Sequence, residues 1–227
     1  MAGEKQVVIP VPLGFVNAFI IRGERSILID AGLPGQEGRI LKAMEQNGIK
    51  PGDISLILIT HGHHDHFGSA AALKQKTGAP LAIHKGDAEH LRTAVNPPLY
   101  PVGSKGKTME FLAKLVKSPK VKGIDADILI EGEMGLGKYG IEGKIIPTPG
   151  HTEGSFSILL AGGEIFIGDL IFGGFIRPKA PGFPYFCQDE QQLLKSIQKV
   201  LDLKPKIIYA GHGGPFTPES VRRRFFS

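Results

Sequence analysis

The sequence contains one cysteine, Cys187, in 227 residues. A single cysteine excludes an internal disulfide, and it also excludes a metal cluster built from several thiolates. No apolar run approaches the length of a membrane span, and residues 1–6 have no long apolar stretch of the kind that secretion signals contain. These absences lead us to expect a cytoplasmic protein that has no membrane partner.

Positive charge is present but not abundant. The net charge is +5 at pH 7, and the short basic cluster Arg222–Arg224 is of the kind expected on a solvated terminus. We therefore expect no nucleic-acid partner. Residues 105–122 hold six lysines and only one acidic residue, Glu110. Two interpretations of this segment stay open: a solvated helix face, or a positive rim that attracts anionic substrates.

The most informative stretch is Thr60–Gly68, in which four histidines and one aspartate fall within residues 61–66. The apolar run Ile54–Ile59 precedes it and predicts a buried strand, and residues 69–77 predict a helix that Gly78 ends. Burying so many imidazoles side by side is costly unless something binds them. A strand-to-helix turn with these donors suits a divalent metal ion of intermediate softness.

Apolar periodicity and Gly or Pro punctuation predict an alternation of strands and helices. The expected strands cover residues 7–11, 18–22, 26–30, 54–59, 80–84, 127–130, 141–146, 157–160, 164–167 and 205–210. The expected helices cover residues 36–47, 69–77, 88–93, 108–117 and 188–203. We expect Asp87 to cap the helix at 88–93. The apolar face of 108–117 could cover the histidine turn or pack in the core, and we expect core packing for most of it. The alternation is typical of an α/β protein.

The pattern T-H-x-H-x-D-H-x-G at Thr60–Gly68 resembles the signature of the metallo-β-lactamase superfamily. Later motifs follow in the family's order, so the resemblance covers nearly the whole chain. It implies a four-layer αββα sandwich of two mixed sheets. It also implies a single domain over residues 1–227, with residues 94–123 as a variable insertion near the site.

The resemblance implies two metal ions, most simply Zn²⁺, with Fe²⁺ or Mn²⁺ as the alternative. The implied ligands are His61, His63 and His151 for one ion, Asp65, His66 and His212 for the second, and Asp169 shared by both. Asp30 ends a strand before a turn. Two roles for it stay open: holding a ligand imidazole through its free N–H, or bonding the turn backbone.

Such a site predicts hydrolysis. Two divalent ions carry four positive charges, of which two carboxylates and a bridging hydroxide cancel three, and bound water ionises near pH 7. We expect this hydroxide to attack an acyl carbon or a phosphorus, with Asp65 as the catalytic residue that aims it. No serine or cysteine nucleophile is needed, so we expect Cys187 to be an inert packing residue.

Two positions narrow the choice among the branches of the family. Asp169 stands where the exported β-lactamases of the family have cysteine, and His63 stands where the diiron oxygen reductases have glutamate. The remaining pattern resembles the hydroxyacylglutathione hydrolases, lactonases and phosphodiesterases. We expect a hydrolase of a small ester, thioester or lactone. The alternatives are a mononuclear non-haem iron dioxygenase of sulfur substrates and a phosphodiesterase.

Between Asp169 and Phe186, four aromatic residues stand in a stretch broken by glycine and proline, which is too many for simple solvent exposure. They are Phe172, Phe175, Phe183 and Tyr185. We expect an aromatic wall at the substrate pocket, with Phe175 and Tyr185 in contact with a small-molecule substrate. The sequence does not indicate an oligomeric state.

Overall fold

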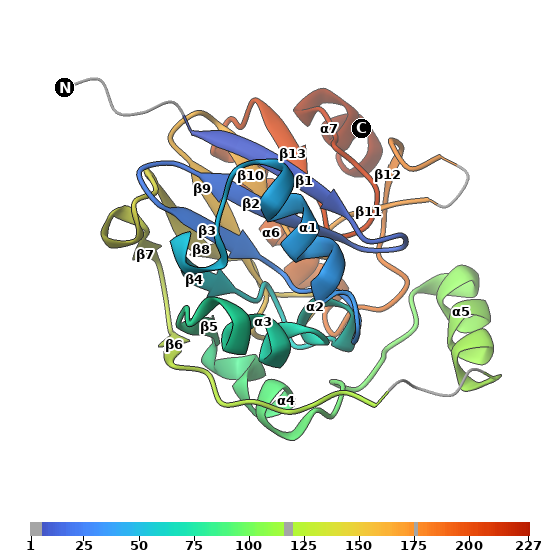
Figure 1. The fold of residues 1–227 in the computed structure, drawn as a ribbon. Helices are drawn as coiled ribbons and strands as arrows, with labels where there is room; N and C mark the ends of the chain where they lie inside the picture. The colour runs from blue at the N-terminus through green and yellow to red at the C-terminus, as the bar shows by residue number, and fades with distance from the viewer. Residues whose placement is uncertain (1–5, 116–119, 175–176) are drawn as a thin grey trace.

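Helices lie on both outer faces of two stacked β-sheets in the computed structural model, which describes residues 6–115, 120–174 and 177–227 (Figure 1). Both sheets are mixed, because each contains parallel and antiparallel pairs. This confirms the predicted fold class, a four-layer αββα sandwich of two mixed sheets.

The first sheet has six strands in the order β1-β2-β3-β4-β5-β6. They are β1 (Val7–Pro12), β2 (Asn17–Arg22), β3 (Ser26–Ile29), β4 (Ile54–Leu58), β5 (Leu81–His84) and β6 (Ile128–Ile130). The first three strands form an antiparallel meander, and β3 to β6 run parallel to one another. The C-terminal ends of β3 and β4 therefore lie at the same edge of the sheet.

The second sheet has five strands in the order β13-β10-β9-β8-β7. They are β7 (Met134–Gly135), β8 (Gly143–Pro147), β9 (Phe156–Leu160), β10 (Glu164–Phe166) and β13 (Ile207–Tyr209). Since β8 and β10 both pair antiparallel with β9, they point the same way, and β13 is parallel to β10. A separate hairpin joins β11 (Phe172–Gly173) to β12 (Pro181–Gly182).

Seven α-helices fall within the described residues. They are α1 (Glu37–Gln46), α2 (His64–Phe67), α3 (Ala70–Thr77), α4 (Ala88–Thr93), α5 (Gly103–Leu115), α6 (Glu190–Asp202) and α7 (Pro218–Phe225). Short 3₁₀ turns occupy Pro51–Asp53, Lys85–Asp87 and Gly137–Tyr139. None of the helices in these ranges has the length and apolar character needed to cross a bilayer.

Three buried apolar clusters correspond to the three contacts between the four layers. The first joins helices α1, α3 and α4 to the first sheet, the second lies between the sheets, and the third joins the second sheet to α6 and α7. Strand β4 shows how one strand contributes to two of these clusters. Its Ile57 faces the helices, whereas Leu56 and Leu58 face the other sheet. Successive side chains of a strand point to opposite faces, so a strand buried on both sides is apolar throughout.

Helix α5 differs from our expectation. We predicted that its apolar face packs in the core, but Phe111, Leu112 and Leu115 are 63%, 47% and 68% exposed. Within the described span Gly103–Leu115, Gly106 is the only buried residue. The helix stands apart from the two sheets (Figure 1). Helical periodicity shows that an apolar face exists, but it does not show what covers that face. The assignment of residues 94–123 as an insertion stays a prediction.

Candidate metal centre

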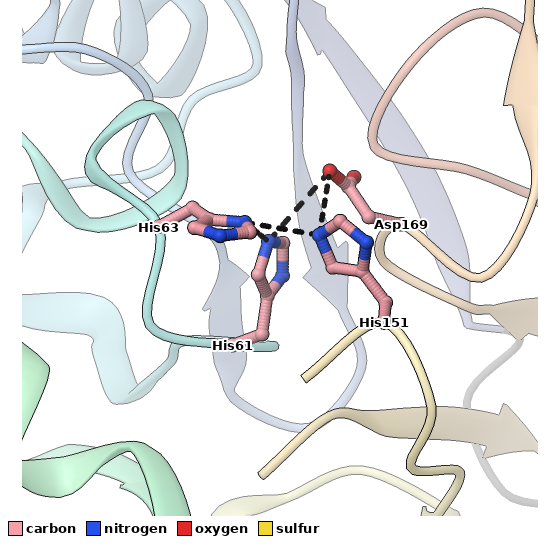
Figure 2. A group of neighbouring side chains, drawn as sticks. All are labelled: His61, His63, His151 and Asp169. Carbon is pink, nitrogen blue, oxygen red and sulfur yellow. Dashed lines mark hydrogen bonds and ion pairs between the residues drawn. The ribbon is translucent and has the colours of Figure 1, made fainter. Parts of the chain in front are cut away.

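Three histidines and one aspartate from both sheets point at one another (Figure 2). His61 and His63 follow β4, while His151 and Asp169 follow β8 and β10. The Nδ1 of His63 lies 3.0 Å from Nε2 of His61 and 2.9 Å from Nε2 of His151. Oδ2 of Asp169 lies 3.6 Å from Nε2 of His61 and 3.4 Å from Nε2 of His151. These four atoms form a donor set that could hold a metal ion.

A second donor set adjoins the first and contains Asp65, His66 and His212. The Nε2 atoms of His66 and His212 are 3.4 Å apart, and Oδ2 of Asp65 lies 3.2 Å from that of His212. The side chain of Asp65 is 25% exposed, whereas the other six candidate ligands are buried. Asp65 therefore lies at the open side of the centre.

Asp169 contacts both sets. Its Oδ1 lies 3.2 Å from Nε2 of His66, and its Oδ2 lies 3.3 Å from Nε2 of His212. Despite these contacts, Oδ1 has no hydrogen-bond partner within the described parts of the chain. A Cβ on the neighbouring Gly211 would collide with this carboxylate. A buried oxygen left in this way is costly, and a cation between the two sets would satisfy it.

Four of the imidazoles are held by an oxygen at Nδ1, which leaves Nε2 free to face the centre. The contacts are His61 to Thr60 Oγ1 at 3.1 Å, His66 to Asp30 Oδ2 at 2.8 Å, His151 to the Phe186 carbonyl at 2.8 Å, and His212 to the Phe15 carbonyl at 2.9 Å. A carbonyl or carboxylate acceptor holds a proton at Nδ1, so the lone pair lies on Nε2 whenever the ring is neutral. This is the tautomer that metal binding requires.

Both roles that the sequence leaves open for Asp30 occur together. Its Oδ1 accepts a 2.8 Å hydrogen bond from the backbone of Thr60, and its Oδ2 contacts both Thr60 Oγ1 and His66 Nδ1. The residue adopts a φ of 61°, a left-handed conformation that aspartate tolerates better than most side chains. Asp30 therefore fixes the start of the histidine turn as well as the orientation of His66.

The expected role of Asp87 is wrong. Its side chain makes no capping hydrogen bond to α4 and is buried. Instead, its carboxylate accepts hydrogen bonds from the backbone of Gly62 at 2.7 Å, from Thr152 Oγ1 at 2.6 Å and from the backbone of Gly154 at 3.0 Å. It thus joins the turn of His61 and His63 to the turn of His151. Its position just after β5, at the sheet edge where β4 also ends, is the sequence signal that could have shown this role.

The two sets differ in proton affinity. Burial lowers the pKa of His61 and of His151, and it lowers that of His63 to about 3. Burial acts in the same direction on His66 and His212, but nearby carboxylates, first among them Asp169, outweigh it. They raise the pKa of His66 well above its usual range and that of His212 to about 9. The first set therefore presents neutral imidazoles at pH 7.

The two carboxylates are held in their charged form. Burial alone would raise the pKa of Asp169, but His212, His66 and His61 outweigh it and keep that pKa well below its usual range. For Asp65 the opposing charges of His66 and His212 likewise outweigh burial and lower the pKa. Neutral imidazoles beside charged carboxylates are the donors that divalent transition metals prefer, so the residues present fit such ions.

The structure brings all seven predicted ligands together, while their role as ligands stays a prediction. His64, in the same run, points elsewhere, because its Nε2 lies 2.9 Å from the carbonyl of Ala94.

Of the predicted aromatic wall, the ring of Phe172 lies 4.3 Å from that of His212 and 6.3 Å from that of His151. Tyr185 stacks edge-on against Phe172, with 5.6 Å between the rings. Phe175 lies outside the described residues.

Comparison with known proteins gives a consistent result. A family model described as the metallo-beta-lactamase superfamily matches residues 11–212. A probable metallo-hydrolase of Methanocaldococcus jannaschii is 32% identical over 199 residues, covering 87% of this chain and 87% of that protein. A probable metallo-hydrolase of Bacillus subtilis is 28% identical over 210 residues, covering 86% of this chain and 78% of that protein.

Solved structures share the fold. The BLEG-1 B3 metallo-beta-lactamase has a TM-score of 0.73 at 24% identity, with 97% of this chain and 98% of that chain covered. A metallo-beta-lactamase superfamily protein from Sulfolobus tokodaii has a TM-score of 0.66 at 24% identity, with 97% and 84% covered. At these identities the likeness shows the architecture alone.

Proposed function

Because this chain belongs to the metallo-beta-lactamase superfamily, we propose that it is a dinuclear zinc hydrolase of a small ester, thioester or lactone. The observation that carries the proposal is the pair of adjoining donor sets that meet at Asp169. His61, His63 and His151 would hold one ion, and Asp65, His66 and His212 would hold the other. Asp169, which contacts residues of both sets, would be shared by the two ions.

When bound, two such ions lower the pKa of water to about 7 and polarise a carbonyl, which is the chemistry that acyl hydrolysis needs. Asp65 has the second task of orienting the attacking water. Its carboxylate is the partly exposed member of the site, and His212 lies 3.2 Å from its Oδ2. An ionised carboxylate accepts hydrogen bonds but donates none, so Asp65 can accept a hydrogen bond from the attacking water or hydroxide and direct its oxygen.

The aromatic side chains next to the centre favour an acyl substrate with an apolar portion. Phe172 packs against His151 and His212, one from each donor set, and is only 7% exposed. Tyr185 extends this surface outward. An apolar wall excludes water from the side of the reacting carbonyl and strengthens the electrostatic interactions there.

Metal content and substrate range together test the proposal. The protein is purified without added metal, analysed for elements, and reloaded with Zn²⁺, Mn²⁺ or Fe²⁺. Each form is then assayed on phenyl esters, thioesters, lactones and phosphodiesters, and oxygen uptake is followed with thiol substrates. We expect two zinc ions per chain and hydrolysis of at least one acyl class. One tightly held iron with oxygen uptake would instead favour the dioxygenase alternative, and cleavage of phosphodiesters alone would favour the phosphodiesterase.

The histidine run itself offers a matched control. His63→Ala removes a donor from the first set, whereas His64→Ala changes the neighbouring residue, whose ring bonds the Ala94 carbonyl instead. We expect His63→Ala to lose metal and activity and His64→Ala to keep both. Equal metal loss in the two variants would contradict the assignment, since it would reflect damage to the turn and not loss of a ligand.

A further inference from the structure

A cavity of about 300 Å³ opens beside Phe172. A second cavity of about 620 Å³ adjoins it, and the two share Lys105, Gly174, Arg177 and Tyr185 among their lining residues. Volumes of this size suit small-molecule ligands. Phe172 lines the smaller cavity and also packs against His212 and His151. Phe172 therefore borders both the cavity and the candidate metal centre.

Three positively charged side chains from separate elements line this space. Lys105 lies on α5, Arg177 lies in the loop between β11 and β12, and Arg224 lies on α7. No aspartate or glutamate lines either cavity. Within the described parts of the chain, none of the three forms an ion pair with a carboxylate, in contrast to Lys114 on the same helix, which pairs with Glu110. The cavity thus has uncompensated positive charge.

The position of Lys105 is fixed by backbone contacts at the start of α5. Val102 donates a 2.9 Å hydrogen bond to the carbonyl of Tyr185, and Pro101 forms a β-bridge with Phe186. Gly106 lies so close to the Tyr185 carbonyl that any Cβ would collide with it. The first turn of α5 is therefore docked on the segment that carries Tyr185, although the rest of the helix projects outward.

We propose that this basic cavity binds an anionic group of the substrate, a carboxylate or a phosphate, located at the end remote from the bond that is cleaved. The proposal rests on the proposed function and names the substrate class of the same site. Arg177, with its fork of N–H donors, and Lys105 form charge-assisted hydrogen bonds to the anion. Arg224 lies over the rings of Phe183 and Phe225, at 5.9 and 5.7 Å, and adds positive charge from the far wall.

Paired substrates that differ only in their remote group test this assignment. Monophenyl esters of succinate, adipate and suberate carry a remote carboxylate, phenyl 5-phosphonopentanoate carries a phosphonate on the same four-methylene chain as the adipate ester, and the terminal amides of the carboxylate esters are neutral. We expect Arg177→Ala and Lys105→Ala each to raise KM for the better anionic ester about tenfold. The neutral amide should change less than about twofold. The carboxylate and phosphonate arms show which anion the cavity prefers.

Two neighbouring lysines serve as controls. Lys107 is exposed on α5 two residues beyond Lys105, and Lys179 is exposed near Arg177, yet neither lines the two cavities. Lys107→Ala and Lys179→Ala should leave KM for the anionic ester unchanged. The assignment is wrong if these controls match Lys105→Ala and Arg177→Ala, which would indicate a general effect of net charge. It is also wrong if the anionic and neutral esters respond equally.

Calorimetry separates this inference from the proposed hydrolysis. The monoanilide of adipate and its terminal amide resemble the esters but resist cleavage, and their binding is measured on protein of known metal content. We expect the anionic anilide to bind at least about tenfold more tightly than the amide, and Arg177→Ala to abolish the difference. If no ester is hydrolysed but this difference is present, the proposed function fails and the anion site stands. If the difference is absent, the anion site fails whatever the esters show.

Discussion

Oδ2 of Asp87 accepts two hydrogen bonds, one of 2.6 Å from Thr152 Oγ1 and one of 2.7 Å from the backbone N–H of Gly62. One buried carboxylate therefore holds the turn of the first sheet that carries His61 and His63 against the turn of the second that carries His151. The relative position of these three imidazoles depends on Asp87, although its carboxylate is bonded to Gly62, Thr152 and Gly154 and not to the imidazoles themselves. Residues of this kind commonly determine how tightly a site binds its metal.

We expect Asp87→Asn to weaken metal binding about 10- to 100-fold. All three groups around the carboxylate are donors, so an amide nitrogen must face at least one of them. Stability of the metal-free protein should fall by about 1–3 kcal/mol because a buried donor is left unpaired. Competition with a chelator measures the affinity. Asp53→Asn changes an exposed carboxylate that bonds the backbone of Lys50 and is the matched control. Equal affinities for the two variants would contradict the role of Asp87.

The two donor sets should release different numbers of protons on binding metal. Because the pKa values of His61, His63 and His151 are low, the first ion displaces almost no protons from its ligands at pH 7. His66 and His212, with raised pKa values, are protonated there and must lose about two protons to the second ion. The affinity for the second ion should therefore rise with pH up to about 9, while that for the first changes little.

Calorimetric titration in buffers of different ionisation enthalpy counts these protons. Water bound to either ion can also lose a proton, and this adds to the count in both steps. The informative quantity is therefore the difference in proton release between the first and the second equivalent of metal. Equal proton release in the two steps would show that the two sets do not differ in protonation.

The resemblance to the metallo-β-lactamase superfamily named the seven candidate ligands, and their position after the ends of apolar strands agreed with it. Strand β4 of the first sheet and strands β8, β10 and β13 of the second end on the same side of the sandwich. Residues that are distant in the chain therefore lie close together there.

The sequence could not show contacts between loops. Asp87 contacts Thr152, 65 residues away, and a side chain that precedes a helix looks like a cap when only local pattern is considered. The basic cavity was missed for a related reason. Lys105, Arg177 and Arg224 lie on three elements. The basic character of residues 105–122 and of Arg222–Arg224 was evident from the sequence, but the sequence did not show that the two segments meet near Arg177.

For Asp65→Asn we expect metal to remain at His61, His63 and His151, with kcat lowered by about a hundredfold or more. Asparagine keeps an oxygen for the metal but lacks the anionic acceptor that orients water, and it raises the charge of the site by one. His151→Ala, by contrast, should lose metal from the first set. Elemental analysis must accompany the kinetics. A fully loaded Asp65→Asn variant with the native kcat would show that Asp65 does not orient the water.

Cys187 should be unreactive in the folded protein. Its thiol is buried, lies 3.1 Å from the Gly150 carbonyl, and has its pKa raised to about 12 by burial. At pH 8 only about one molecule in ten thousand then carries the reactive thiolate, compared with roughly a fifth for a free cysteine. Labelling with a thiol reagent should be slow in buffer and fast in denaturant. Equally rapid labelling in both conditions would contradict this burial.

The candidate ligands come from both sheets, and this has a consequence for the lifetime of the protein. His61, His63, Asp65 and His66 follow a strand of the first sheet, whereas His151, Asp169 and His212 follow strands of the second. An ion that needs donors from both binds only while the sheets are together, so mass action adds RT ln(1 + [L]/Kd) to their cohesion. This is about 4 kcal/mol when the free ion is about 1,000 times its Kd. A cell that runs short of the ion would therefore lose the protein to proteolysis as well as its activity.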